Sequence, residues 1–414
     1  MLEDFPLIHG PQKRADAFHL ATLSEGGLFD FDASTPQTQF DFKEAIRGIS
    51  ELIKRWYEFP NCKKFLDILH AGFVVNSEPN AFSLSAPELN VIGIYSGLAW
   101  VINEMWATLL CHNNFLPEIE HNKSFDKREI ESRLRTGIFV TDGFLTETDH
   151  EMQWREHPWR HLSDSRLSIA AVLSAMSIQF VFYHEMAHLL LGHAEYVTAK
   201  TGVSLHELER RRRNIPVPPY ELQGLEFEAD GVATCIALGS SSMLRHFSDE
   251  KTRDPRWMLS FYYVWGLSVE GVFRLFSQST WDLVTYQIST HPHPFARGYG
   301  NWLNVLGNSS LEHHPLRENI LNEYAKAMTD LAKYWHQFKM PGYDSDPIHD
   351  PNLWRTHDGY RLAEGLLVRA VRALQNTRDE RAKFELPEIR AAFTFGSEVL
   401  ANLIKAEQDR LDAV

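Results

Sequence analysis

The sequence has few cysteines and little positive charge. Its three cysteines, Cys62, Cys111 and Cys235, are odd in number and far apart in a chain of 414 residues. That arrangement implies neither a disulfide framework nor a cysteine-based zinc site. The net charge is −14, which argues against general binding to nucleic acid or to an anionic membrane surface. We therefore expect no nucleic-acid partner.

An uninterrupted apolar run of membrane-spanning length is also missing. The three most apolar stretches, residues 91–111, 167–183 and 259–276, all contain polar or charged side chains. We interpret each as a buried helix of a large core, so no integral membrane span is expected. The first ten residues, MLEDFPLIHG, lack the basic segment and apolar core of a signal peptide. A soluble, cytoplasmic protein is the expectation.

Apolar periodicity indicates a mainly α fold of the α+β class, with a small β-sheet or hairpin in the middle. The segment 66–76 has the character of either a helix end or a short strand. Asp142-Gly143, flanked by β-forming residues, predicts a hairpin over 138–146. The predicted helices cover residues 41–59, 88–112, 166–191, 203–213, 221–238, 256–278, 296–307, 316–338, 360–375 and 386–410.

The stretch FVFYHEMAHLLLGHAEY carries the first chemical motif. His184, Glu185 and His188 form H-E-x-x-H, and residues four apart lie on one face of a helix. Two histidines in that register can bind one zinc ion, and the neighbouring carboxylate can take a proton from a water on that ion. The alternative is an ordinary buried helix whose histidines are satisfied by hydrogen bonds.

His193 follows a helix-ending glycine, Gly192, and is a tempting third ligand. If the helix continued, His193 would lie about 140° around the axis from His188, at about 100° per residue. The pattern H-E-x-x-H-x-x-G-x-x-H requires glycine at 191 and histidine at 194, where this chain has Leu191 and Ala194. We therefore predict that His193 caps the helix end or supports the site and does not bind the ion.

The predicted third ligand lies in the segment LEFEADGVATCIAL. Glu226 and Asp230 are four residues apart on one helix face, which they share with the small residues Ala229 and Ala233. Small residues allow this helix to approach the first one closely. Glu226 can then bind zinc while Asp230 accepts the outer N–H of a ligating histidine. Glu228 is predicted to point elsewhere, and the alternative for the whole segment is a solvated acidic face.

The segment THPHPFARG supplies a third element, in which His291-Pro292 precedes Arg297. A histidine after a rigid loop can donate a hydrogen bond to a developing oxyanion, and an arginine can hold the site or the substrate carbonyl. Taken alone, this segment is a turn that happens to contain histidines.

Together, and in this order, the three elements resemble the gluzincin metallopeptidases of the CAAX-prenyl-protease and HtpX type. The resemblance covers residues 165–300 and implies a zincin-like core with an active-site helix and a glutamate helix. It implies zinc ligands His184, His188 and Glu226, general base Glu185 and supporting Asp230, with His291 and Arg297 as transition-state helpers. HEMAHLLLGH is also similar to soluble ImmA/IrrE-type proteases and Lit-type phage-exclusion peptidases.

The resemblance implies a zinc metalloendopeptidase that binds one Zn²⁺ per chain and hydrolyses an intracellular protein or peptide substrate. We expect a helical region over 1–112, the metallopeptidase core over 113–310 and a second helical region over 311–414. The hairpin 138–146 is the candidate edge for an extended substrate, and a purely structural ribbon is the alternative. The rival function is a non-catalytic or regulatory zinc-binding protein derived from such a peptidase.

Overall fold

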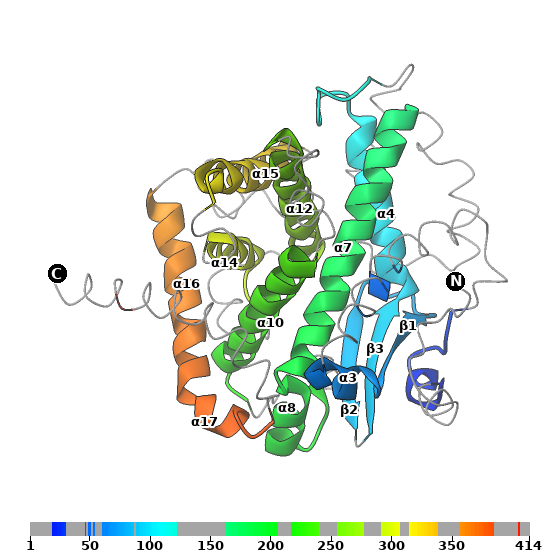
Figure 1. The fold of residues 1–414 in the computed structure, drawn as a ribbon, viewed down its shortest axis with the longest axis vertical. Coiled ribbons are helices and arrows are strands. Elements are labelled where there is room, and N and C mark those ends of the chain that lie inside the picture. The colour runs from blue at the N-terminus through cyan, green and yellow to red at the C-terminus, as the bar shows by residue number, and fades with distance from the viewer. Residues whose placement is uncertain are drawn as a thin grey trace.

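A computed structural model shows a mainly helical protein with a small three-stranded sheet. The described residues are 19–29, 46, 49–50, 53, 60–86, 88–121, 162–205, 217–240, 255–276, 291–306, 314–337, 357–384 and 405. Figure 1 shows one long central helix, α7 (Asp164–Leu190), with the sheet on one side and most of the later helices on the other.

The sheet has the strand order β1-β3-β2. The central strand β3 (Leu89–Tyr95) pairs in parallel with β1 (Leu69–Val74) and antiparallel with β2 (Ala81–Ala86). All six residues of β1 are buried, and five of the six are apolar or glycine, as in a strand that is covered on both faces. A short helix, α3 (Pro60–Leu66), precedes the sheet, and α4 (Ser96–Cys111) leaves it directly after β3.

The helix α7 packs against elements on both sides of the molecule, namely α4, β2, β3, α10 and α12. Its N-terminus is capped by the Ser163 hydroxyl, which accepts a hydrogen bond from the Arg166 amide. It ends before Gly192, which takes a left-handed conformation with φ 66° and starts the next helix, α8 (His193–Thr201). The chain therefore changes direction at Gly192, just after the H-E-x-x-H segment, as the glycine at this position led us to expect.

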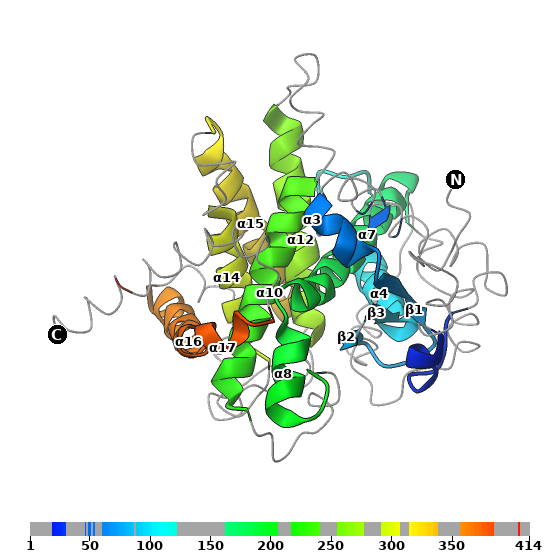
Figure 2. The same ribbon diagram turned by 60° about the horizontal axis from the view of Figure 1, so that its bottom comes forward.

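The remaining helices cover the other side of α7 (Figures 1 and 2). They are α10 (Pro219–Ser240), α12 (Pro255–Phe276), α14 (Pro294–Leu306), α15 (Arg317–Gln337), α16 (His357–Asn376) and the single turn α17 (Arg378–Arg381). Proline is the first residue of α10, α12 and α14, a position where its missing N–H carries no penalty. Figure 2 shows α17 beside α8, and the two elements are in contact.

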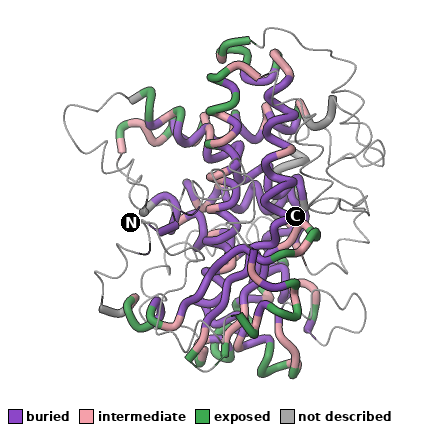
Figure 3. Tube along the Cα trace, turned by 90° about the vertical axis from the view of Figure 1, so that its right-hand side faces the viewer, coloured by how far each residue is buried: buried purple, intermediate pink, exposed green. Residues whose placement is uncertain are grey.

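Buried residues fill the middle of the molecule, and exposed residues lie mostly at the ends of its helices (Figure 3). One cluster of buried apolar side chains extends from Phe29 near the N-terminus to Val371 in α16. The three-part division expected at residues 112 and 310 stays a prediction.

A buried arginine joins α7 to the end of α4. Arg166 is fully buried, and its guanidinium donates hydrogen bonds of 2.8–3.4 Å to backbone carbonyls between Leu110 and Glu120. The last carbonyls of a helix have no partner within the helix, so this side chain satisfies part of the C-terminus of α4 and the turns that follow.

Several expectations need correction or lie outside the described residues. The helix expected over 88–112 begins only at Ser96, because the preceding residues form strand β3. The segment 66–76 contains strand β1. The described sheet therefore lies at residues 69–95. The hairpin expected over 138–146 lies outside the described residues. So does the helix expected over 386–410, except for Lys405. The predicted helix over 41–59 has helical, buried residues at Ile46, Ile49 and Ile53.

Among the described residues, α7 is the helix long and apolar enough to cross a membrane. Of its most apolar 18-residue window, 56% is buried inside the protein, and core helices of globular proteins have the same length and composition. The expectation of a protein without integral spans stays a prediction.

Candidate metal centre

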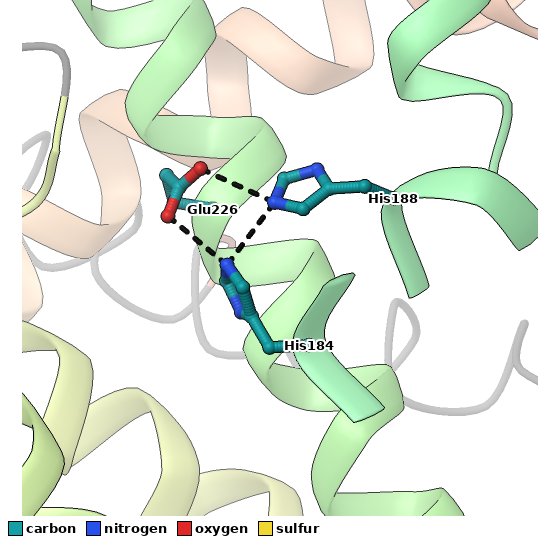
Figure 4. A group of neighbouring side chains, drawn as sticks. All are labelled: His184, His188 and Glu226. Carbon is teal, nitrogen blue, oxygen red and sulfur yellow. Dashed lines mark hydrogen bonds and ion pairs between the residues drawn. The ribbon is translucent and has the colours of Figure 1, made fainter. Parts of the chain in front are cut away.

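Three predicted ligands meet at one point between α7 and α10. His184 and His188 lie one turn apart on α7, and Glu226 faces them from α10 (Figure 4). The Nε2 atoms of the two histidines are 3.1 Å apart. Glu226 places Oε2 3.3 Å from His184 Nε2 and Oε1 3.3 Å from His188 Nε2. All three side chains are buried, so this is an enclosed group that can bind a metal ion.

The spacing of these atoms fits a small tetrahedral ion. Ligands about 2.0–2.1 Å from a tetrahedral zinc ion are separated from one another by about 3.3 Å. The separations of 3.1, 3.3 and 3.3 Å are close to that value. Two imidazoles and one carboxylate also form a donor set typical of catalytic zinc, which keeps a fourth position for water.

Asp230 and Arg297, which we call the Asp230 support, lie behind His184. The outer nitrogen of His184, Nδ1, lies 2.9 Å from Asp230 Oδ1. Arg297 donates to both Asp230 oxygens at 2.7 Å and also reaches Glu226 Oε2 at 3.5 Å. Its guanidinium carbon lies 4.6 Å from the centre of the Phe273 ring. The arginine therefore neutralises Asp230 and limits its movement.

A second group lies behind His188. Its outer nitrogen, Nδ1, is 3.0 Å from Nδ1 of His193, whose Nε2 is 3.1 Å from Glu228 Oε2. Arg381 of α17 donates to the same Glu228 oxygen. We call His193, Glu228 and Arg381 the His193 support. His193 thus lies behind the ligand His188, on the side away from the centre.

These supports determine which ring nitrogens carry protons. An ionised carboxylate can only accept, so His184 donates from Nδ1 to Asp230, and His193 donates from Nε2 to Glu228. Neutral His193 then has a lone pair on Nδ1 and accepts the proton of His188 Nδ1. Both ligating histidines are left with lone pairs on Nε2, which face each other and the Glu226 carboxylate. Three electron-pair donors that face one another are the arrangement that a cation, whether a proton or a metal ion, stabilises.

The pKa values agree with this assignment. Burial lowers the pKa of His193 to about 4, against the opposing effect of Glu228, so the ring is neutral at physiological pH. Burial raises the pKa of Glu228, but the charge of Arg381 and the hydrogen bond with His193 lower it to about 2 overall. Asp230 is likewise buried, and Arg297 and His184 keep its pKa below the usual value.

His184 shows that the centre favours a positive charge. Burial lowers its pKa, but the charge of Glu226 and its hydrogen bonding with Asp230 raise the pKa to about 10 overall. In the metal-free protein, a proton on His184 supplies the positive charge. A metal ion bound by the same atoms replaces that proton.

Of the residues predicted for the site, Glu185 and His291 are the two that are not buried. From Phe180 to Ala194, Glu185 is the residue that is not fully buried. The His291 side chain is 41% exposed, and its Nε2 lies 4.0 Å from Glu226 Oε2. The carboxylate predicted as general base and the histidine predicted as oxyanion donor are therefore both accessible from solvent.

The structure thus brings together most of the residues predicted for the site and adds two contacts that the sequence did not indicate. Arg297 binds Asp230 and Glu226, so holding the site is the role its contacts favour. Glu228 is not part of the His184, His188 and Glu226 group, as predicted. It contacts His193, and this supporting position was not anticipated, nor was that of Arg381. The signal for Glu228 was present in the acidic pair of LEFEAD, whereas Arg381 lies 153 positions further along the chain.

Comparisons of the chain with protein-family models, with curated proteins and with solved structures found no match. The functional argument therefore depends on the chain's own residues and their geometry.

Proposed function

We propose that this protein is a zinc-dependent metalloendopeptidase that hydrolyses peptide bonds of an intracellular protein substrate. The observation that carries the proposal is the convergence of His184, His188 and Glu226 beside Glu185, a partly accessible carboxylate in an otherwise buried stretch. A site that only stabilised the fold would prefer a fourth protein ligand and has no use for a carboxylate there. The similarity to gluzincins, a zincin-like core and a cytoplasmic location are parts of the same proposal.

Each residue has one task in this reaction. His184, His188 and Glu226 would hold the ion, which when bound acidifies water and polarises a carbonyl. Glu185 takes a proton from the attacking water as the new C–O bond forms, and it delivers that proton to the leaving amine as the C–N bond breaks. His291 donates a hydrogen bond to the oxyanion that develops on the substrate carbonyl.

The edge strand β2 is the proposed place for an extended substrate. Within the described sheet it is the strand that borders α7 and α8, and its Ser85 hydroxyl hydrogen-bonds Glu195 of α8. Backbone groups on a free strand edge can pair with a peptide by β-augmentation. The sequence-based candidate for this edge, the hairpin 138–146, lies outside the described residues.

The decisive experiment compares the wild type with Glu185→Gln. Both proteins should bind one zinc per chain, whereas the variant should lose about 10²–10⁴-fold in kcat on a cleaved peptide. Glu318→Gln, the same chemical change on an exposed position of α15, is the control and should leave activity unchanged.

Substrates are found by proteome-wide labelling of new protein termini in cells that express the wild type or Glu185→Gln. Termini that depend on Glu185 support the proposal and report the cleavage preference. If zinc-loaded wild type produces no termini beyond those of the variant, the rival function of a non-catalytic zinc protein replaces it. Full zinc content with unchanged cleavage in Glu185→Gln rejects Glu185 as the base.

A further inference from the structure

We propose that α17, near the C-terminal end of the described chain, is part of the metal site through the His193 support. In this arrangement Arg381 fixes Glu228, Glu228 fixes His193, and His193 orients His188 for ligation. All three are positioning residues, since none of them is placed to touch the metal or a substrate. The inference rests on the proposed function only in requiring that the centre bind a metal.

Both nitrogens of the His193 ring have an assigned partner. His193 has no exposed surface, and its two ring nitrogens lie 3.0 Å from His188 and 3.1 Å from Glu228. Two contacts on opposite sides of the ring prevent it from turning. A ring held this way presents its Nδ1 lone pair to His188 and so determines which nitrogen of His188 faces the metal.

Arg381 fixes the outer end of the His193 support. Its side chain is 9% exposed, against 28% for Glu228, so the ion pair is shielded on the arginine side. A second nitrogen of the guanidinium donates to the Leu374 carbonyl at 3.3 Å, which ties Arg381 to the end of α16. A partly buried ion pair held at both ends has far less freedom than an exposed one.

The backbone after α17 also contacts the turn that follows the active-site helix. A Cβ atom on Gly192 would lie 2.5 Å from the backbone of Phe384, so only glycine permits this approach. Nearby, Tyr196 of α8 donates a 2.6 Å hydrogen bond to Glu221 of α10, and Lys200 pairs with the same carboxylate at 2.7 Å. The elements that carry His193, Glu228 and Arg381 are therefore packed together as one unit.

The two metal-binding histidines consequently depend on different parts of the chain. His184 is supported from α10 and α14, which adjoin the centre. His188 is supported by His193 of α8, which Glu228 of α10 and, through it, Arg381 of α17 hold in place. We therefore expect metal affinity to depend on whether α17 is docked against α8 and α10.

The test measures zinc affinity of the full-length chain by competition with a chromophoric chelator. His193→Leu removes the acceptor for His188 and should weaken zinc binding by about 10–100-fold. His193→Asn places an amide oxygen where Nδ1 was and should recover most of that loss. Glu228→Gln and Arg381→Met should give smaller losses in the same direction. Arg378→Met, an exposed arginine of the same turn, is the matched control and should match the wild type.

Circular dichroism and the Tm of the metal-free variants show whether each protein is folded. If His193→Leu does not fold, the comparison of Glu228→Gln and Arg381→Met with Arg378→Met decides the question. Wild-type affinity in all the folded variants, or equal losses in His193→Leu and His193→Asn, would overturn the inference.

Failure of the proposed function is distinguishable from failure of this inference. A wild type that binds zinc but cleaves nothing removes the peptidase proposal, while the affinity series still decides the role of the His193 support. A wild type that binds no zinc overturns both.

Discussion

Arg297 donates two hydrogen bonds of 2.7 Å to Asp230, one to each carboxylate oxygen. This is the bidentate geometry that a guanidinium, with its planar set of donors, makes with a carboxylate. Both side chains are buried, so neither charge is stable there without the other. Since Asp230 also lies 2.9 Å from His184, the arginine acts on the candidate metal centre indirectly, by positioning the aspartate.

Replacing Arg297 by lysine tests whether it acts through Asp230 or on the reacting carbonyl. A lysine keeps the charge but cannot make the two parallel hydrogen bonds. We expect zinc affinity to fall by about 10–100-fold, with most of kcat restored at saturating zinc. Arg369→Lys, at an exposed position of α16, is the control. Unchanged zinc affinity with a large loss of kcat would instead make Arg297 a direct transition-state donor.

Substitution of His291 should give the opposite result to Arg297→Lys, namely a lower kcat with little change in zinc affinity. Its side chain is half-exposed, and its Nε2 lies 4.0 Å from Glu226, too far for a strong contact with the ligand. We expect His291→Ala to lower kcat by about 10²–10³-fold, the usual effect of losing one oxyanion donor, and to change zinc affinity little. His314→Ala removes another histidine that precedes a proline and should leave kcat unchanged. Zinc loss in His291→Ala alone would contradict the assignment.

The three candidate metal ligands were predictable because their positions follow from local periodicity. Histidines four apart must share a helix face, and so must Glu226 and Asp230, whatever the rest of the fold does. The structure confirms that His184, His188 and Glu226 form one group. The His193 support was not predictable in the same way. It depends on the direction the chain takes after Gly192 and on where α17 docks, and tertiary packing decides both.

The error in the fold has a similar physical cause. Residues 89–111 are apolar almost throughout, and in such a run the burial pattern of a covered strand cannot be told from that of a buried helix. The β-branched residues Val91, Ile92 and Ile94 and the glycine between them were the signal for β3. Helices with caps or an initial proline were placed more accurately, since α7, α10 and α12 begin within about two residues of their predicted starts.

Because the guanidinium of Arg166 is buried and hydrogen-bonded, we expect substitution of this residue to cause a large loss of stability. It is the donor for carbonyls at the end of α4 and in the following turns, and those carbonyls would lose a buried hydrogen bond. We expect Arg166→Met to lower the free energy of unfolding by about 3 kcal/mol or more, and Arg166→Lys by less. Urea unfolding measures this, with the exposed Arg361→Met as control. A change below about 1 kcal/mol would show that water replaces the arginine at these carbonyls.

The last prediction concerns the proton that occupies the metal centre when zinc is removed. The pKa of His184 is raised to about 10 in the folded, metal-free protein, above the usual value of 6.5. Its contribution to stability is therefore complete below pH 6.5 and disappears as the pH rises through about 10. Chelator-treated protein should lose a few kcal/mol of unfolding free energy between pH 7 and pH 10 from this group.

Zinc-loaded protein should show a much weaker dependence over the same range, because zinc binds neutral His184 and no proton remains to be lost. His184→Asn in chelator is the matched control, since it removes the titrating ring. Denaturant titrations at pH 7, 8, 9 and 10 compare the three samples. Parallel pH profiles for the chelated and zinc-loaded wild type would show that proton and metal do not compete for His184. They would then contradict the assignment of its Nε2 as a ligand.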